Sequence, residues 1–201
     1  MKQNLLLFCL IFLISCSQNA QTQNKKSQTG EKQNYATELI DSGFLKYADR
    51  SMVDSLKTHI VDSFNVYEKE NYKITHIDAE ELAEFSFDFF LPNLNEILAK
   101  RYIELSVQKL NENQNSFEIL INGETLQLYT KNELKNETFW DKATRNFFKK
   151  INEILKAKKC DEQFYLLYGG NDLHSLLLTD RQFSIISNYY HDNNKEKPYK
   201  P

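Results

Sequence analysis

The segment 168–174 (YGGNDLH) holds the densest local group of side chains that could do chemistry. Its two glycines would let the backbone approach a partner closely, and Asn171, Asp172 and His174 could bind a ligand or move a proton. Glycine, Asn and Asp are also the residues that a tight turn requires. We interpret the segment first as a turn and keep a binding or catalytic site as the alternative.

A second candidate site is an acidic row on a helix that we expect to begin at Asp78, a capping residue with Glu81 at the capping-box position. At about 100° per residue, three carboxylates share one face of this helix with a phenylalanine beside them. These residues are Glu80, Glu84, Asp88 and Phe87. A solvated face is the simpler interpretation, but an exposed Phe flanked by carboxylates would suit a protein interface. The helix should reach about Leu91, where Pro92 breaks or kinks it.

The sequence contains no metal-ligand spacing. No two cysteines are spaced as metal ligands, and no two histidines form a His-x-x-x-His pair. The four histidines are far apart in sequence: His59, His76, His174 and His191. Phosphate loops and a Gly-x-Ser-x-Gly elbow are also missing, so we predict neither a metal nor a cofactor. Catalytic groups can still assemble from distant residues. Cys160 has no His near it in sequence, and we interpret it as a structural or incidental thiol.

The composition fits one globular domain. The 201 residues are 41% hydrophobic and 26% charged, and an aromatic share of 13% supplies large side chains for a core. A net charge of −3 and a pI near 5.9 give no electrostatic footprint for nucleic acid.

Two N-terminal helices are predicted from apolar residues at three- and four-residue steps. The longer helix carries the stripe Met52, Val53, Leu56, Ile60, Phe64 and Tyr67. We expect Ser51 to cap it, with Asp54 at the third position. A shorter helix should cover residues 36–40 and stop near Gly43, and the stripe Leu94, Ile97 and Leu98 predicts a helix after Pro92.

Alternation with a period of two then predicts a three-stranded antiparallel meander. Its strands carry Ile103, Leu105 and Val107, then Phe117, Ile119 and Ile121, then Leu126 and Leu128. Residues 111–115 should form the first turn. Asn122-Gly123 is the strongest short hairpin signal, because both central residues of such a turn need positive φ.

The last third of the chain predicts a helix, a hairpin and a final helix. Thr138 should cap a helix with a buried stripe of Phe139, Ala143, Phe147, Ile151, Ile154 and Leu155. Strands over 163–168 and 173–178 should flank the glycine turn, and Thr179 with Gln182 should cap the last helix. The predicted fold class is α+β: N-terminal helices followed by an antiparallel sheet of about five strands, in the order meander, helix, hairpin, helix.

The N-terminus predicts a cleaved leader. Residues 5–14 are apolar and uncharged, a run too short to cross a bilayer. Leu13-Ile14-Ser15-Cys16 follows and resembles the lipobox of bacterial lipoproteins. This resemblance implies cleavage before Cys16, acyl chains on its thiol and effectively permanent membrane anchoring.

We expect four segments in the chain. They are a signal peptide (1–15), a lipidated Cys and flexible tether (16–34), a single domain (35–191) and a disordered tail (192–201). Ser17-Gln18-Asn19 follows the cysteine where an acidic retention signal would stand. By analogy with the family, we expect the anchored protein to lie at the periplasmic face of the outer membrane.

The leading functional hypothesis is a non-catalytic domain that binds another protein, for example an immunity-type inhibitor of an incoming toxin. The first alternative is a hydrolase-like periplasmic enzyme that uses Asn171, Asp172 and His174. The second is an envelope structural or assembly factor. A pocket that joins His174 to another His or to a carboxylate would favour the enzyme. A flat acidic and aromatic patch would favour the binder.

Overall fold

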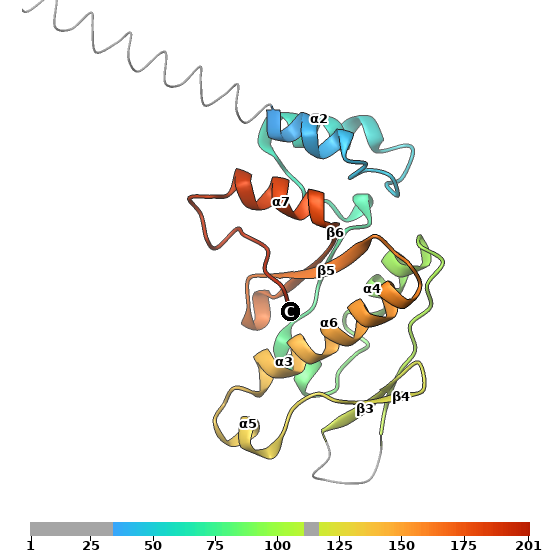
Figure 1. Ribbon diagram of the computed structural model, residues 1–201, viewed down its shortest axis with the longest axis vertical. Helices are drawn as coiled ribbons and strands as arrows, with labels where there is room; N and C mark the ends of the chain where they lie inside the picture. The colour runs from blue at the N-terminus through green and yellow to red at the C-terminus, as the bar shows by residue number, and fades with distance from the viewer. Residues whose placement is uncertain (1–33, 111–116) are drawn as a thin grey trace, which may run out of the picture.

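The computed structural model describes residues 34–110 and 117–201. The leader, Cys16, nearly all of the tether and the predicted turn at 111–115 lie outside the described residues. The described part is mixed α+β, with helices packed around two three-stranded antiparallel sheets (Figure 1). Among the helices of this part, none is long and apolar enough to cross a membrane.

Sheet A consists of three strands in the spatial order β1 (Ile74–His76), β6 (His174–Thr179) and β5 (Glu162–Leu167). Both of its faces are buried. One face contributes Tyr165, Leu167, Leu176 and Leu178 to a core shared with α2 (Val53–Ser63) and α7 (Asp180–Tyr189). The other contributes Phe164, Leu166 and Leu177 to a core shared with α6 (Phe139–Ala157). Burial on both faces explains why β5 and β6 are nearly continuous apolar runs.

The second sheet, sheet B, is the predicted meander of β2 (Val107–Lys109), β3 (Glu118–Ile121) and β4 (Glu124–Gln127). Ile121 pairs with Glu124, so Asn122 and Gly123 form a two-residue turn with φ of 50° and 84°. The side-chain oxygen of Asn122 also accepts a hydrogen bond from the backbone N–H of Ser106, at 2.7 Å. The hairpin prediction is therefore confirmed.

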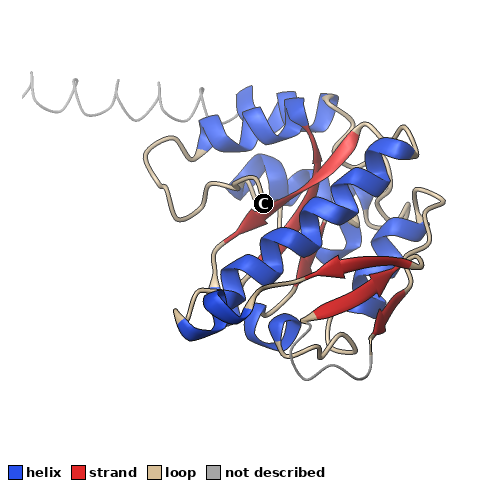
Figure 2. Ribbon diagram, turned by 60° about the horizontal axis from the view of Figure 1, so that its bottom comes forward, coloured by secondary structure: helices blue, strands red, loops and turns tan. Residues whose placement is uncertain are grey.

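The prediction of one five-stranded sheet is wrong. The strands form two sheets because α6 lies between them, in contact with β5 on one side and β4 on the other (Figure 2). Ile119 and Ile121 pack in the same core as Phe147 and Phe148 of α6. The third strand of sheet A is β1, in a segment for which no strand was predicted.

The prediction of one long helix from Asp78 to Leu91 is also wrong. The Asp78 side chain caps α3 (Ala79–Ala83) as expected, accepting from the N–H groups of Glu80 and Glu81. This helix then ends, and Phe85 has a positive φ of 63°. Pro92 lies in the first turn of α4 (Leu91–Ala99), where the missing N–H needs no partner, so it begins a helix instead of breaking one.

The other helices follow the predicted stripes more closely than the predicted caps. A helix covers residues 34–41. Met52 occupies the N-cap position of α2, so Ser51 is not its cap, and the Ser51 hydroxyl donates to Asp49 at 2.9 Å instead. Thr138 precedes α6 without a side-chain cap, whereas Thr179 and Gln182 form the expected capping box of α7. Three short helices are additional: η1 (Lys69–Asn71), η2 (Gly170–Asp172) and α5 (Lys131–Lys135).

The C-terminal segment 192–201, predicted to be disordered, is docked on the domain. Tyr199 pairs antiparallel with Leu166, each N–H donating to the other's carbonyl at 2.8 Å. Its hydroxyl donates to the carbonyl of Tyr168 at 2.8 Å, and Arg145 donates to the carbonyl of Lys200 at 3.1 Å. The polar composition of the segment hid one aromatic anchor, Tyr199, which covers the outer edge of β5.

Candidate functional site

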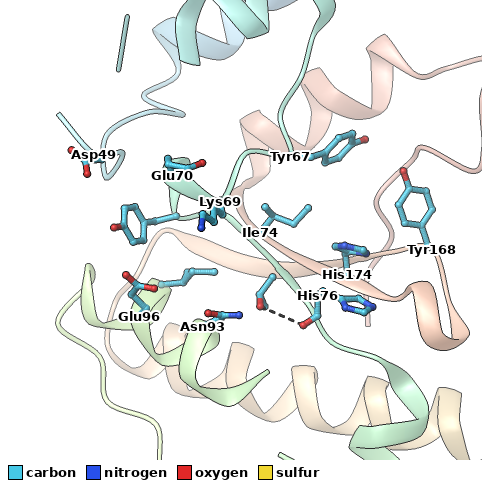
Figure 3. Close-up of a pocket in the computed structure, with 13 residues that line it drawn as sticks. Asp49, Tyr67, Lys69, Glu70, Ile74, His76, Asn93, Glu96, Tyr168 and His174 are labelled. Atoms are coloured by element: carbon cyan, nitrogen blue, oxygen red, sulfur yellow. Dashed lines mark hydrogen bonds between the residues drawn. The ribbon is translucent and has the colours of Figure 1, made fainter. Parts of the chain in front are cut away.

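Two histidines lie side by side at the start of β6 and the end of β1. His76 and His174 are partners in the antiparallel register, and their ring centroids are 4.8 Å apart (Figure 3). They occupy a non-hydrogen-bonded pair, the position at which cross-strand side chains approach most closely. The structure thus joins His174 to a second histidine that lies 98 positions earlier in the sequence.

Each imidazole is held by one backbone carbonyl of η2. His76 Nε2 donates to the carbonyl of Asn171 at 2.6 Å, and His174 Nδ1 donates to the carbonyl of Asp172 at 2.8 Å. A carbonyl can only accept, so these bonds fix the neutral tautomer of each ring. The other two nitrogens, His76 Nδ1 and His174 Nε2, have no hydrogen-bond partner in residues 34–110 and 117–201.

The environment of His174 favours its uncharged form. Burial lowers the pKa of His174, and the neighbouring His76 lowers it further. The hydrogen bond to the Asp172 carbonyl raises the pKa but does not outweigh burial. His174 is therefore neutral at neutral pH, with a free lone pair.

The pair opens into a cavity of about 680 Å³. Its other walls come from η1, α4 and the segment before α2, and they carry three carboxylates and one amine: Asp49, Glu70, Glu96 and Lys69. Figure 3 shows Tyr67 and Tyr168 on the His174 side and Asn93 and Glu96 across the cavity. Both tyrosine hydroxyls donate to Glu196 of the docked tail, at 3.2 and 2.6 Å. The cavity is thus a mixed aromatic and acidic site.

The cavity wraps around the outer edge of sheet A. Ile74, Thr75 and His76 all line it, although successive strand residues point to opposite faces. On the inner side, Leu177 donates to the Lys73 carbonyl at 2.7 Å, and Ile77 donates to the Leu173 carbonyl at 2.9 Å.

Bonded residues alternate along an antiparallel strand, so the backbone N–H and C=O groups of Ile74 and His76 point away from β6. Within the described residues, the one hydrogen bond to these four groups is a long one, from the Thr75 hydroxyl to the His76 carbonyl at 3.4 Å. The edge of β1 therefore presents unpaired donors and acceptors to the cavity.

The predicted acidic and aromatic patch does not exist as one surface. Phe87 is 6% exposed and packs against Phe90 and Phe147, so it cannot serve as an exposed anchor. The reason is the end of α3 at Ala83, which removes the helical face that Glu80, Glu84 and Asp88 were to share. These three carboxylates are exposed. The exposed ring in this segment is instead Phe89, which lies edge-on to His76 at 5.3 Å.

The glycine segment is a turn and also part of the site. Asn171 and Asp172 lie in η2 with exposed side chains, and Gly170 has a positive φ of 59°. Their backbone carbonyls, not their side chains, contact the histidines. The turn interpretation is confirmed, and a binding or catalytic role for the Asn171 and Asp172 side chains stays a prediction.

A second polar cluster is buried but fully paired. Glu162 accepts from Lys73 and from Arg101, the latter at 2.7 and 3.1 Å, and Lys73 also donates to Gln182 at 3.2 Å. Burial alone would raise the pKa of Glu162, but the hydrogen bonds and charges of Arg101 and Lys73 lower it. The cluster ties the residue before β1 to β5 and α7, and both carboxylate oxygens of Glu162 are engaged.

Cys160 lies beside this cluster. The Cys160, Asp161 and Glu162 ligand atoms are close enough for a metal ion, but both Glu162 oxygens already accept from the two cations. Burial raises the pKa of the Cys160 thiol, which keeps it protonated and a weak ligand or nucleophile.

The role of His76 and the cavity edge could not be predicted from the sequence. The only local signal was the alternation Lys73-Ile74-Thr75-His76-Ile77, too short to distinguish from a loop. No protein-family model matches this chain, and no curated protein or solved structure matches it either.

Proposed function

We propose that this chain is a lipid-anchored protein of the bacterial envelope whose domain binds a protein partner in the cavity beside β1. The observation that carries this proposal is the cavity itself, which encloses an unpaired strand edge. An extended segment of a partner can add to such an edge through backbone hydrogen bonds, and the surrounding side chains then select its sequence. An immunity-type inhibitor of a toxin is one concrete form of this function.

The charges around the edge favour a basic segment. Three carboxylates and a single lysine line the cavity: Asp49, Glu70, Glu96 and Lys69. Opposite charge on the partner would steer association and fix its orientation, while the backbone bonds of Ile74 and His76 would supply affinity.

Membrane attachment is the part of this proposal that rests on the lipobox at Cys16. Acyl chains on this cysteine would hold the domain at the periplasmic face of the outer membrane. Cys16→Ala should abolish fatty-acid labelling and leave an unprocessed or mislocalised precursor. Labelling that survives the substitution would overturn the assignment.

The edge contact can be tested with a proline substitution. Ile74→Pro removes an N–H that points into the cavity and breaks no bond to β6, so the edge strand should tolerate it. Random peptides displayed on phage are selected on the full-length protein in detergent micelles. We expect basic, proline-poor peptides whose binding is lost in Ile74→Pro.

The matched control is Ile74→Val, which keeps the N–H and most of the side chain. Selected peptides should bind this variant as they bind the wild type. Peptides that bind Ile74→Pro equally well would exclude edge pairing, and a selection that enriches no peptide would contradict the proposed binding function.

The second candidate function is an enzyme, and the His76–His174 pair is the observation that favours it. A neutral imidazole in a cavity can act as a general base. Its weakness is the surroundings. Within the described residues, neither free nitrogen forms a hydrogen bond with a hydroxyl, a thiol or an orienting carboxylate. A hydrolytic activity that His174→Asn removes while peptide binding persists would establish the enzyme instead.

A further inference from the structure

The free nitrogens of His76 and His174 suit a ligand that the protein-binding proposal does not require. In the described residues, the other two histidines have carboxylate partners: His59 lies 3.1 Å from Glu68, and His191 lies 2.8 Å from Asp192. The cavity pair has no such partner. The second nitrogen of each ring therefore has no hydrogen-bond partner within the described residues, and both residues line the cavity.

The spacing of the rings matches two ligands on a single ion. A metal bound to imidazole lies about 2.0–2.1 Å from the nitrogen, which places two rings on one tetrahedral ion with centroids about 5 Å apart. The observed separation is 4.8 Å, with the ring planes inclined by 32°.

The backbone around the pair already provides the outer contacts of a metal site. Metal-ligating histidines usually donate their other ring N–H to a carbonyl or carboxylate, which fixes the tautomer and the ring orientation. Here both rings do so, to neighbouring carbonyls of the same turn, Asn171 and Asp172. Both rings are half-buried and are thus held in place without a metal.

We propose that His76 Nδ1 and His174 Nε2 together bind one divalent transition-metal ion, with water from the cavity in its remaining positions. Imidazole nitrogen selects copper, nickel or zinc over magnesium and calcium, which prefer oxygen. Because the protein supplies two ligands, the ion should exchange readily and the fold should not depend on it.

Copper(II) is the probe for the first test. The full-length lipidated protein carries Cys160→Ser, so that the thiol cannot bind, and is held in detergent micelles. Electron paramagnetic resonance should show one copper per chain with nitrogen couplings from two imidazoles. A spectrum with one imidazole, or none, would overturn the proposal without any histidine variant.

Two substitutions remove the ligands and keep the outer contacts. In His174→Asn the side-chain amide replaces Nδ1 as donor to Asp172, and in His76→Gln the amide replaces Nε2 as donor to Asn171. Each should weaken zinc binding, measured by calorimetry, by at least about tenfold. The loss of a partner that only orients a metal ligand already lowers metal affinity by about tenfold or more. His59→Gln and His191→Asn are the controls and should bind zinc as the parent does. Unchanged affinity in the first two variants would refute the site.

Discussion

Sheets A and B differ in how far apart in sequence their strands lie. Sheet B uses neighbouring strands within residues 107–127, joined between β3 and β4 by the two-residue turn at Asn122 and Gly123. Sheet A takes β5 and β6 from 162–179 and its third strand from residues 74–76. Sheet B can be predicted from its turn signals and from the alternation of apolar and polar residues. The sheet closed by a distant strand carries the histidine pair, the cavity and the buried charges.

This difference also separates their energetics. Sheet A is held at its margin by the buried Lys73–Glu162–Arg101 cluster, whereas the ion pair beside sheet B, Glu124 with Lys150, has an exposed carboxylate. Buried charges that lose a partner are far more costly than exposed ones.

The largest expected effect is therefore the loss of Glu162. Glu162→Ala leaves two buried cations without their counter-charge and should lower the free energy of unfolding by about 3–5 kcal/mol. Glu124→Ala, at the exposed pair, should lower it far less, because solvent screens that pair. Urea denaturation of both variants measures the difference. Equal losses would show that the two sheets do not differ in this respect.

An intermediate effect is expected at the two hairpin turns. Gly123 has φ of 84°, so the Cβ of Gly123→Val is strained there, and the variant should lose about 1–2 kcal/mol. Gly169, in the turn of sheet A, is extended with φ of −172°, and a Cβ added there would meet no atom within 4 Å beyond its chain neighbours. Gly169→Ala should therefore change stability by less than about 0.5 kcal/mol. A larger loss at Gly169 would reverse this ranking.

The smallest expected effect is a loss of folding stability at low pH. The pKa of Glu162 is lowered in the folded protein, so its contribution to stability is present above the unfolded value of about 4.3. It is lost as pH falls through the lowered pKa, with a slope of at most about 1.4 kcal/mol per pH unit. Thermal melts between pH 6 and 2 should show a shallower acid loss for Glu162→Gln than for the wild type. Parallel curves would contradict the assigned ionisation.

The sequence predicted the elements that depend on neighbouring residues. Asn122-Gly123 requires positive φ wherever it lies, and the stripe of α6 buries Ala143, Phe147 and Ile151 as the spacing indicates. The capping box of Thr179 and Gln182 is similarly local. In each case, the physical cause acts within one turn of the chain.

Predictions that depended on tertiary packing were wrong. Helical spacing alone placed Phe87 on a solvent face, but α3 stops early and the ring enters the core beside Phe147. His76 offered no motif, because its partner His174 is brought to it only by the pairing of β1 with β6. The tail was classed as polar, although a single ring, Tyr199, suffices to dock it.

The docked tail also limits the number of strands that can add to sheet A. Tyr199 occupies the β5 edge, while the β1 edge stays available at the cavity. With the β5 edge covered, a partner strand can pair directly with sheet A only beside β1. If both edges were bare, each added molecule would present a new edge, and strand addition could continue into a filament. If the proposed strand addition at β1 occurs, the docked segment 192–201 would therefore restrict pairing with sheet A to a single edge.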